Sequence, residues 1–258
     1  MLDGSVEGKR RLSWSSRTSQ IAAPQGSVPE GTRIYAIGDV HGCLDLLESV
    51  LARIEIDMGT HPASNAIRIF LGDYIDRGPD SKRVLDRLVD CCVSQPTVCL
   101  MGNHEAFLRE FLKDPDVLAV WRHCGGLDTL LSYGLTPKTE TDAQDQLELA
   151  SELERILPSS HREFLSGLKQ WFACGDYFFV HAGIRPGICL TEQSEDDLLW
   201  IREDFLSSED HFGKIVVHGH TPVLEPDVRP NRINIDTGAY ATGRLSCLVL
   251  ESDRIRFI

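Results

Sequence analysis

The sequence predicts an α/β fold in which two mixed β-sheets pack face to face as a sandwich, flanked by helices and a helical cap. Two observations predict this fold. In the first half, three short apolar runs each lead into a glycine-containing turn and then a helical pattern, which is the βαβαβ order of a parallel sheet. After residue 170, short strand patterns dominate, and they are expected to form the second sheet.

The first half of the chain carries the parallel strands. We expect strands at Ile34–Ile37, Ile67–Leu71 and Val98–Met101, because each run is short, apolar and followed by a turn. A helix with apolar residues between Leu44 and Ile54 follows the first strand. Pro79 marks the entry of another helix after the second strand.

The second half is predicted in less detail. Residues 106–170 have helical patterns and are expected to form a cap beside the sheet, where substrate selectivity could reside. The later strand patterns are expected to form an antiparallel set, and they cover Tyr177–Val180, Lys214–Val217, Ile233–Ile235, Leu245–Leu250 and Ile255–Phe257.

Residues 31–258 are predicted to form a single catalytic domain. The chain has 258 residues, 42% of them hydrophobic and 25% charged, which is enough to build one large buried core. Residues 1–30 are rich in Ser, Gly, Pro and basic residues and could bury little surface. We therefore expect them to form a flexible N-terminal arm.

Charge and composition exclude several classes of protein. A net charge of −13 argues against a general nucleic-acid binder, which needs a basic face. No run approaches the ~20 apolar residues of a membrane span, and the N-terminus lacks the apolar core of a signal peptide. We expect a cytoplasmic monomer that binds neither nucleic acid nor a membrane.

The eight cysteines include no Cys-x-x-Cys pair, so small buried thiols in a reducing compartment are expected rather than disulfides or a zinc site. Cys43 follows His41 by two positions. Its oxidation could disturb a metal ion bound there, although an inert buried thiol is favoured.

Polar motifs follow the ends of five predicted strands. They are Gly38-Asp-Val-His-Gly42, Gly72-Asp-Tyr-Ile-Asp-Arg-Gly78, Gly102-Asn-His-Glu105, His181-Ala-Gly183 and Gly219-His-Thr-Pro222. Open α/β sheets bind ligands at the carboxyl ends of their strands. A single Asp or His in such a motif is often a helix cap or a structural residue. The joint occurrence of all five favours one shared site.

The strand ends supply carboxylate, amide and imidazole groups, which suit manganese, iron or zinc, and the absence of thiolates argues against a structural zinc site. A shared carboxylate can bridge two ions ~3.5–4 Å apart that hold a hydroxide for in-line attack on phosphorus. At this point either His218 or His220 could be a ligand. The candidate metal ligands are Asp39, His41, Asp73, Asn103, His181 and His220.

The remaining polar residues could supply the other catalytic groups. Arg77 and Arg202 can hold phosphate oxygens through their planar guanidinium groups, although a surface salt bridge with Glu203 or Asp204 is an alternative for Arg202. His104 is a candidate general acid, with Asp76 orienting it and favouring its charged form.

Together, these motifs resemble the phosphoprotein phosphatase group of calcineurin-like metallophosphoesterases over about residues 33–250. Trp200-Ile-Arg202 and Asp236-Thr-Gly-Ala239 are most similar to its bacterial and lambda-bacteriophage branch. The resemblance implies the calcineurin-like metallophosphoesterase fold. It also selects His220 over His218, because the family ligand directly precedes the Thr-Pro pair, here Thr221-Pro222.

The resemblance implies a role for each matching residue. One ion would be held by Asp39, His41 and Asp73, and the other by Asp73, Asn103, His181 and His220. The catalytic set would comprise His104, Asp76, Arg77 and Arg202, and the substrate contacts would comprise Arg77, Arg202, Asn103 and Tyr240. The sequence around Tyr240 differs from that of the eukaryotic members, which leaves its role open.

The leading interpretation is a metal-dependent phosphomonoesterase that removes phosphate from Ser or Thr of a phosphorylated protein or peptide, with dual specificity toward Tyr left open. It would use two divalent ions, with Mn²⁺ favoured and Fe or Zn as alternatives. A symmetrical dinucleoside tetraphosphate hydrolase is the alternative, since such enzymes share the motifs. A non-catalytic scaffold that binds phosphorylated partners is disfavoured, because no acid, ligand or arginine is missing.

Overall fold

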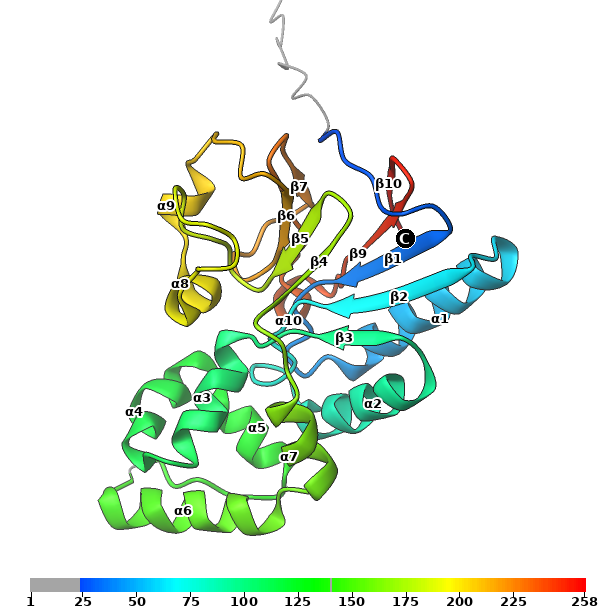
Figure 1. The fold of residues 1–258 in the computed structure, drawn as a ribbon. Coiled ribbons are helices and arrows are strands. Elements are labelled where there is room, and N and C mark those ends of the chain that lie inside the picture. Colours follow the sequence, from blue (N-terminus) through cyan, green and yellow to red (C-terminus); the bar gives the residue numbers. More distant parts are fainter. Residues whose placement is uncertain (1–23, 140) are drawn as a thin grey trace, which may run out of the picture.

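The structure, a computed structural model, describes residues 24–139 and 141–258. Its first sheet is mixed and has the strand order β10-β9-β1-β2-β3 (Figure 1). β1 (Thr32–Ile37) is buried along its whole length, as expected for an apolar strand covered on both faces. It pairs in parallel with β2 (Asn65–Phe70), which pairs in parallel with β3 (Thr97–Cys99). β9 (Cys247–Glu251) is antiparallel to β1 and pairs with β10 (Arg254–Phe257).

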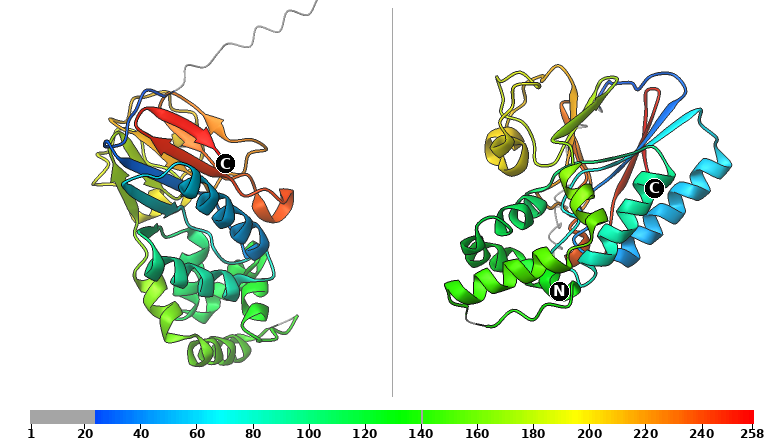
Figure 2. Two further views of the ribbon diagram at one scale, coloured as in Figure 1. Left: turned by 90° about the vertical axis from the view of Figure 1, so that its right-hand side faces the viewer. Right: turned by 60° about the horizontal axis from the view of Figure 1, so that its bottom comes forward.

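The two faces of β1 point into different cores, because successive side chains of a strand alternate between its faces. Tyr35 and Ile37 pack with apolar residues of α1 (Leu44–Thr60) and α2 (Ser81–Ser94), the two helices that connect the parallel strands. Ile34 and Ala36 belong to a second core that also contains residues of the second sheet. The first sheet therefore lies between a helical layer and the second sheet (Figures 1 and 2).

The second sheet has the order β4-β5-β6-β8-β7. Its central strands β5 (Tyr177–Val180), β6 (Ile215–His218) and β8 (Arg232–Asn234) are parallel to one another. Two antiparallel edge strands, β4 (Trp171–Cys174) and β7 (Asp227–Val228), complete it.

The prediction of an antiparallel late set was therefore wrong for β5, β6 and β8, and it was right only for β9 and β10, which belong to the first sheet. A short apolar strand carries no signal for its direction. The direction is decided by the connection that brings the chain back. After β5 that connection contains α8 (Glu195–Trp200) and α9 (Glu203–Leu206).

The predicted helical cap is present as a contiguous block at one end of the sheets (Figure 1). It begins with α3 (Asn103–Phe111), whose first turn carries a predicted site motif. The remaining elements of the cap are η1 (Pro115–Val117), α4 (Leu118–Trp121), η2 (Arg122–Cys124), α5 (Gly126–Ser132), α6 (Ala143–Ile156) and α7 (Ser159–Ser166).

The register of the strands brings their carboxyl ends together. Ile37 pairs with Phe70, and Phe70 pairs with Cys99, so β1, β2 and β3 end level with one another. Their arrowheads point to the same side in Figure 1. In the second sheet, Phe179 of β5 pairs with Val217 of β6. The loops that follow these five strands carry the five motifs.

Residues 24–30, which the sequence prediction assigned to the arm, contact the domain. The Ser27 backbone N–H donates to Asp176 Oδ2 at 2.9 Å, and Val28 is buried in the core between the sheets. The remainder of the predicted arm, residues 1–23, lies outside the described residues. Among residues 24–139 and 141–258, no helix is both long and apolar enough to cross a membrane.

Replacing Leu248 with Ala should destabilise the domain. Leu248 is fully buried between the two sheets, and removing a large apolar side chain from a core costs about 2–5 kcal/mol. The free energy of unfolding, measured by urea denaturation of the metal-free protein, should fall by that amount. Leu224→Ala is the matched control, because Leu224 is 81% exposed and its loss should change stability by less than about 0.5 kcal/mol. Equal effects of the two substitutions would contradict the described packing.

Candidate active site

The loops at the strand ends have an unusual backbone. Five residues have φ between 46° and 72°, in the left-handed region that residues other than glycine rarely adopt. They are His41, Asp73, Asp76, Arg77 and His220. Such conformations cost about 1–3 kcal/mol each, so they persist where the surrounding structure enforces them, often at functional sites. All five residues belong to the predicted motifs.

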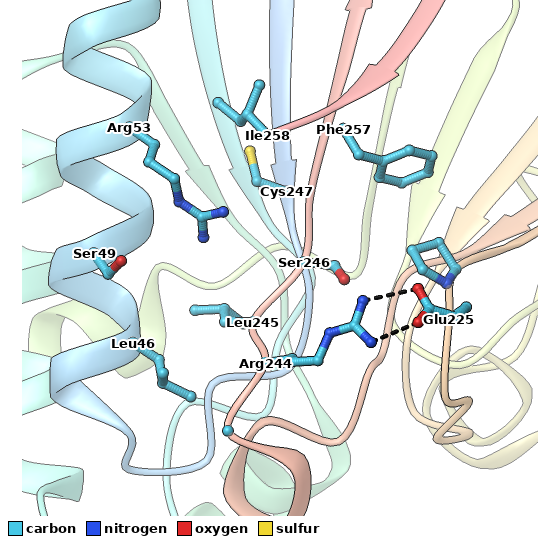
Figure 3. A pocket seen from close by; sticks show the side chains of 12 residues that line it. Leu46, Ser49, Arg53, Glu225, Arg244, Leu245, Ser246, Cys247, Phe257 and Ile258 are labelled. Atoms are coloured by element: carbon cyan, nitrogen blue, oxygen red, sulfur yellow. Dashed lines mark hydrogen bonds and ion pairs between the residues drawn. The ribbon is translucent and has the colours of Figure 1, made fainter.

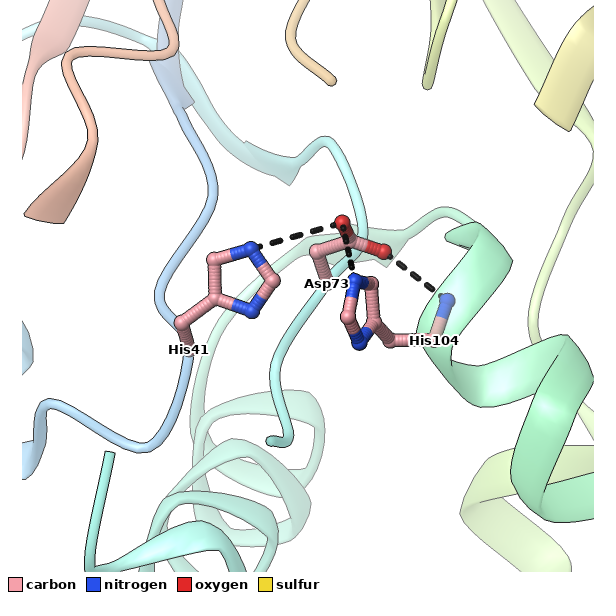
Figure 4. Close-up of side chains that lie close together, drawn as sticks. All are labelled: His41, Asp73 and His104. Atoms are coloured by element: carbon pink, nitrogen blue, oxygen red, sulfur yellow. Dashed lines mark hydrogen bonds and ion pairs between the residues drawn. The ribbon is translucent and has the colours of Figure 1, made fainter. Parts of the chain in front are cut away.

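Asp73, in the loop after β2, lies between two groups of potential ligands. The first group contains His41, Asp73 and His104, with Asp73 Oδ2 at 3.5 Å from His41 Nε2 and 3.7 Å from His104 Nε2 (Figure 4). The Ile75 carbonyl accepts a hydrogen bond from His41 Nδ1 at 3.0 Å, which leaves Nε2 free to face Asp73.

The second group contains Asp73, His181 and His220. Asp73 Oδ1 lies 3.4 Å from His181 Nε2. Asn103 Oδ1 lies 2.9 Å from both His181 Nε2 and His220 Nδ1, so its amide oxygen joins the same group. His181 Nδ1 donates to the Leu71 carbonyl at 2.9 Å, which orients its ring. The two oxygens of Asp73 thus face the two groups.

Asp39 lies beside these groups without belonging to either. Its Oδ2 accepts a hydrogen bond from the His220 backbone N–H at 3.0 Å, and its Oδ1 is buried without a hydrogen-bond partner among the described residues. Burial and the nearby carboxylates of Asp236 and Asp73 raise the pKa of Asp39 well above its usual value. A buried carboxylate oxygen in this state would be satisfied by a cation.

His218 and His220 occupy different environments. His218 lies outside both groups, with its ring 5.0 Å from that of Phe205 and its Nδ1 at 3.1 Å from the Gly219 carbonyl oxygen. His220 lies within the second group, and its Nε2 is buried without a partner among the described residues. The arrangement favours His220 as the ligand.

The electrostatics of the site suit divalent metal ions. Burial lowers the pKa of His41 to about 3 and that of His220 to about 2, so both imidazoles are neutral at pH 7, the form that coordinates metals. Three buried carboxylates, those of Asp39, Asp73 and Asp236, repel one another. Oxygen and imidazole donors with excess negative charge fit borderline-hard divalent cations.

His104 is held by Asp76 in the manner of an acid and its orienting carboxylate. His104 Nδ1 donates to Asp76 Oδ2 at 2.6 Å, and Asp76 also accepts from Trp121 Nε1 at 2.6 Å and Thr129 Oγ1 at 2.5 Å. Burial opposes the charged form of His104, but the carboxylates of Asp73 and Asp76 outweigh it and raise the pKa of His104 above its usual value. Its Nε2 is left facing the centre of the site.

One arginine flanks each ligand group. Arg77 Nη2 lies 3.3 Å from His104 Nε2, and the Arg77 guanidinium lies 4.7 Å from the centre of the Tyr240 ring. Arg202 donates to Thr221 Oγ1 at 3.1 Å. The alternative salt bridge of Arg202 with Glu203 or Asp204 is not formed among the described residues, and Asp204 pairs with Arg185 at 3.0 Å.

Tyr240 reaches the site from α10 (Ala239–Thr242). Its ring lies 5.4 Å from that of His41, and 44% of the residue is exposed. The structure therefore brings Tyr240 next to Arg77 and His41, at the open side of the site.

Sequence reasoning gave no role to Glu105 and Asp236, which are both buried at the site. Glu105 accepts backbone hydrogen bonds from Gly102, Asp73, Tyr74 and Ile75, so it fixes the loop that presents Asp73. A Glu at the third position of a helix, able to bond back to the residue before the helix, is a recognisable sequence signal that could have identified it. Asp236 accepts from the Gly238 N–H at 2.9 Å, and its signal was the Asp236-Thr-Gly-Ala239 motif, which was used only for the family resemblance.

A pocket of about 580 Å³ lies away from the candidate site, between α1 and the end of the chain. Figure 3 shows Arg53 and Arg244 among its lining side chains, with both terminal nitrogens of Arg244 bonded to the carboxylate of Glu225, at 2.6 and 2.8 Å. None of the predicted site residues lines this pocket. Arg244 and Glu225 of this pocket pair with each other, and among the described residues the pocket contains no cluster of potential metal ligands, so we assign it no chemistry.

Cys43 is half-buried, and its Sγ lies 3.4 Å from the His41 carbonyl oxygen. Burial and the nearby Asp45 and Asp80 raise the pKa of the Cys43 thiol to about 11. The reactive thiolate is therefore disfavoured at neutral pH, which agrees with the inert thiol that the sequence favoured.

Comparison with known proteins places this geometry in context. Residues 32–251 match the family model of the calcineurin-like phosphoesterases. A bis(5'-nucleosyl)-tetraphosphatase, PrpE [asymmetrical], from Oceanobacillus iheyensis is 29% identical over 83% of this chain and 87% of its own length. A symmetrical bis(5'-nucleosyl)-tetraphosphatase from Acidovorax sp. is 32% identical over 54% of this chain and 56% of its own length.

Solved structures share the fold. The crystal structure of a protein provisionally named a diadenosine tetraphosphatase has a TM-score of 0.60 and 21% identity, and the match covers 92% of this chain and 98% of that one. A cold-active protein-tyrosine phosphatase from a psychrophilic Shewanella has a TM-score of 0.53 and 17% identity, with coverage of 89% and 80%. At these identities the similarity shows the fold alone.

Replacing Glu105 with Gln should loosen the loop that carries Asp73. The amide of Gln offers an N–H₂ group where a carboxylate oxygen of Glu105 accepts backbone N–H groups, and each unsatisfied buried donor costs about 1–3 kcal/mol. We expect the unfolding free energy of the metal-free protein to fall by about 2 kcal/mol or more. Metal affinity, measured by calorimetry, should fall by about 10–100-fold, as for other groups that orient ligands.

The matched control is Glu110→Gln, an exposed Glu on the same helix, α3. It should leave both quantities close to those of the unmodified protein. If Glu105→Gln behaved like this control, Glu105 would have no part in holding the Asp73 loop.

Proposed function

We propose that this chain, which belongs to the calcineurin-like phosphoesterase family, is a metal-dependent hydrolase that cleaves dinucleoside tetraphosphates asymmetrically. The observation that carries the chemistry is the shared Asp73 carboxylate between two ligand groups, each flanked by an arginine. The proposed substrate follows the names of the relatives, since an asymmetrical tetraphosphatase matches most of this chain. This reverses the order of preference from the sequence, which placed phosphoproteins first.

The motifs alone could not distinguish phosphoproteins from dinucleoside tetraphosphates, because their residues would contact only the phosphate that both substrate classes contain. The alternative named from the sequence was the symmetrical enzyme. The relative with the symmetrical activity matches only about half of this chain, whereas the asymmetrical relative spans 83% of it. We therefore favour cleavage into a nucleoside monophosphate and a nucleoside triphosphate over cleavage into two diphosphates.

The residues that would hold two divalent ions are those that surround Asp73. One ion would be held by Asp39, His41 and Asp73, and the other would be held by Asp73, Asn103, His181 and His220. When bound, such ions neutralise phosphate oxygens and make a water molecule nucleophilic near neutral pH. The predicted Mn²⁺ remains the favoured ion, with Fe or Zn as alternatives.

The chain's own residues supply the remaining steps. Arg77 lies beside His104 and Arg202 lies beside Thr221, and both would bind the oxygens of the phosphate under attack. His104 Nε2 would donate a proton to the oxygen of the departing nucleotide, while the Nδ1–H bond to Asp76 keeps the ring in place. Tyr240 packs on Arg77 and would keep its guanidinium aimed at the substrate.

The products of diadenosine tetraphosphate test the proposed reaction. Protein stripped of metal by chelation should be inactive, and protein reloaded with Mn²⁺ should release AMP and ATP, as resolved by ion-exchange chromatography. Release of two ADP molecules would make the enzyme symmetrical. A phosphoserine peptide serves as the competing substrate, and faster turnover of that peptide than of the dinucleotide would restore the phosphoprotein phosphatase interpretation.

Two histidines of the first group should respond differently to substitution. His104→Asn should lower kcat by about 10²-fold or more, because it removes the proton donor, while the protein keeps two Mn²⁺ ions per chain. His41→Asn should reduce the metal content as well, because His41 is proposed to be a ligand. Metal content is read by atomic absorption after gel filtration. Loss of an ion in His104→Asn would instead make His104 a ligand.

A further inference from the structure

A second pocket opens beside the proposed active site, between α3 and α8. It has a volume of about 390 Å³, and its wall includes Phe107, Val117, Leu199 and Trp200, with Arg109 and Glu195 at its rim. This volume lies within the range of small-molecule sites, which are mostly apolar with a few polar groups. We propose, on the basis of the function proposed above, that this pocket binds one nucleoside of the substrate.

The pocket adjoins the proposed active site, because two of its aromatic residues lie next to histidines of that site. The Phe107 ring lies 6.3 Å from the ring of His104, and the Trp200 ring lies 6.2 Å from that of His220. The two aromatic rings contact each other edge to face, with their centres 5.2 Å apart. A molecule whose phosphate occupies the centre of the site can therefore extend directly onto Trp200.

The exposed aromatic surface suits a nucleobase. Trp200 is 38% exposed although it is the last residue of a helix whose preceding residue, Leu199, is buried. An exposed indole next to a phosphate site offers a flat surface on which a base can stack, independently of which base it is. Phe107 packs against the edge of the indole and would hold it in place.

The charges at the rim favour the nucleoside end of the substrate over its phosphates. Glu110, Glu195 and Asp196 line the pocket, and Arg109 is paired with Glu195 at 2.5 Å. This acidic rim repels phosphate groups but can accept hydrogen bonds from ribose hydroxyls or base amino groups. The cationic groups Arg77 and Arg202 lie at the centre of the site instead. The two regions therefore separate the charged and uncharged parts of a dinucleotide.

Substitution of Trp200 tests the proposal. The ratio of kcat/KM for diadenosine tetraphosphate to kcat/KM for p-nitrophenyl phosphate is measured with Mn²⁺-loaded protein. The ratio cancels any effect on the phosphate site itself, because p-nitrophenyl phosphate has no nucleoside. Trp200→Ala should lower this ratio about tenfold or more, chiefly through KM for the dinucleotide. Trp200→Phe, which keeps an aromatic ring, should recover most of it.

The control variant is Phe257→Ala, because Phe257 is also a partly exposed aromatic, at 41%, but lies on β10 away from this pocket. It should leave the ratio unchanged. A ratio in Trp200→Ala within twofold of the unmodified protein would overturn the nucleoside site, as would a Phe variant as impaired as the Ala variant. A selective loss toward a phosphoserine peptide would also overturn it, because the pocket would then receive a peptide.

Failure of the proposed function gives a different result. In that case the unmodified Mn²⁺-loaded protein would hydrolyse p-nitrophenyl phosphate and not the dinucleotide, so the ratio would be near zero before any substitution. That result would contradict both the proposed function and the nucleoside site. A high ratio that does not respond to Trp200→Ala would leave the reaction standing and remove only the nucleoside site.

Discussion

The candidate site depends on holding several carboxylate groups close together where they are shielded from water. Asp73 stands at the centre and is buried, and burial together with the Asp73 carboxylate raises the pKa values of Asp39, Asp236 and Glu105. Burial and the neighbouring carboxylate of Asp73 raise the pKa of Glu105, whereas its hydrogen bonds from the Tyr74 and Asp73 backbone N–H groups oppose this rise. Such a concentration of carboxylates is unfavourable without positive charge, and bound divalent cations would supply it. The left-handed turns and the bonds from Glu105 keep these groups in place.

The fold brings these groups together because strands of both packed sheets end at the same side of the molecule. β1, β2 and β3 end level with one another and present Asp39, His41, Asp73 and Asn103, while β5 and β6 present His181 and His220. Loops at the ends of strands can hold strained conformations, because the hydrogen-bonded sheet fixes the positions of their ends. The chemistry of the phosphate is therefore built on the sheets, and the helices of the cap and of the β5–β6 connection surround it.

This division explains why related sites serve different substrates. The groups around Asp73 act on a phosphate whatever it is attached to, and the same motifs fit phosphoproteins and dinucleotides. We propose that substrate choice comes from the surfaces beside the site, which include Phe107 on α3, Trp200 on α8 and the acidic residues around them. Phe107 lies on a segment that shows only helical periodicity, and the motif that contains Trp200 indicated a branch of the family without indicating a substrate. A fold and a metal centre can thus be shared while the reaction differs.

The sequence by itself determined the βαβαβ half, the helical cap and the residues of the candidate site, because metal-ligand chemistry demands particular side chains in short motifs directly after strands. Only the tertiary structure decided the parallel direction of β5, β6 and β8, the place of β9 and β10 in the first sheet, and the packing of residues 24–30. It also separated His218 from His220, left Asp39 beside the ligand groups and gave Glu105 its four backbone donors. These features depend on contacts between segments far apart in the chain, whose partners no local pattern specifies.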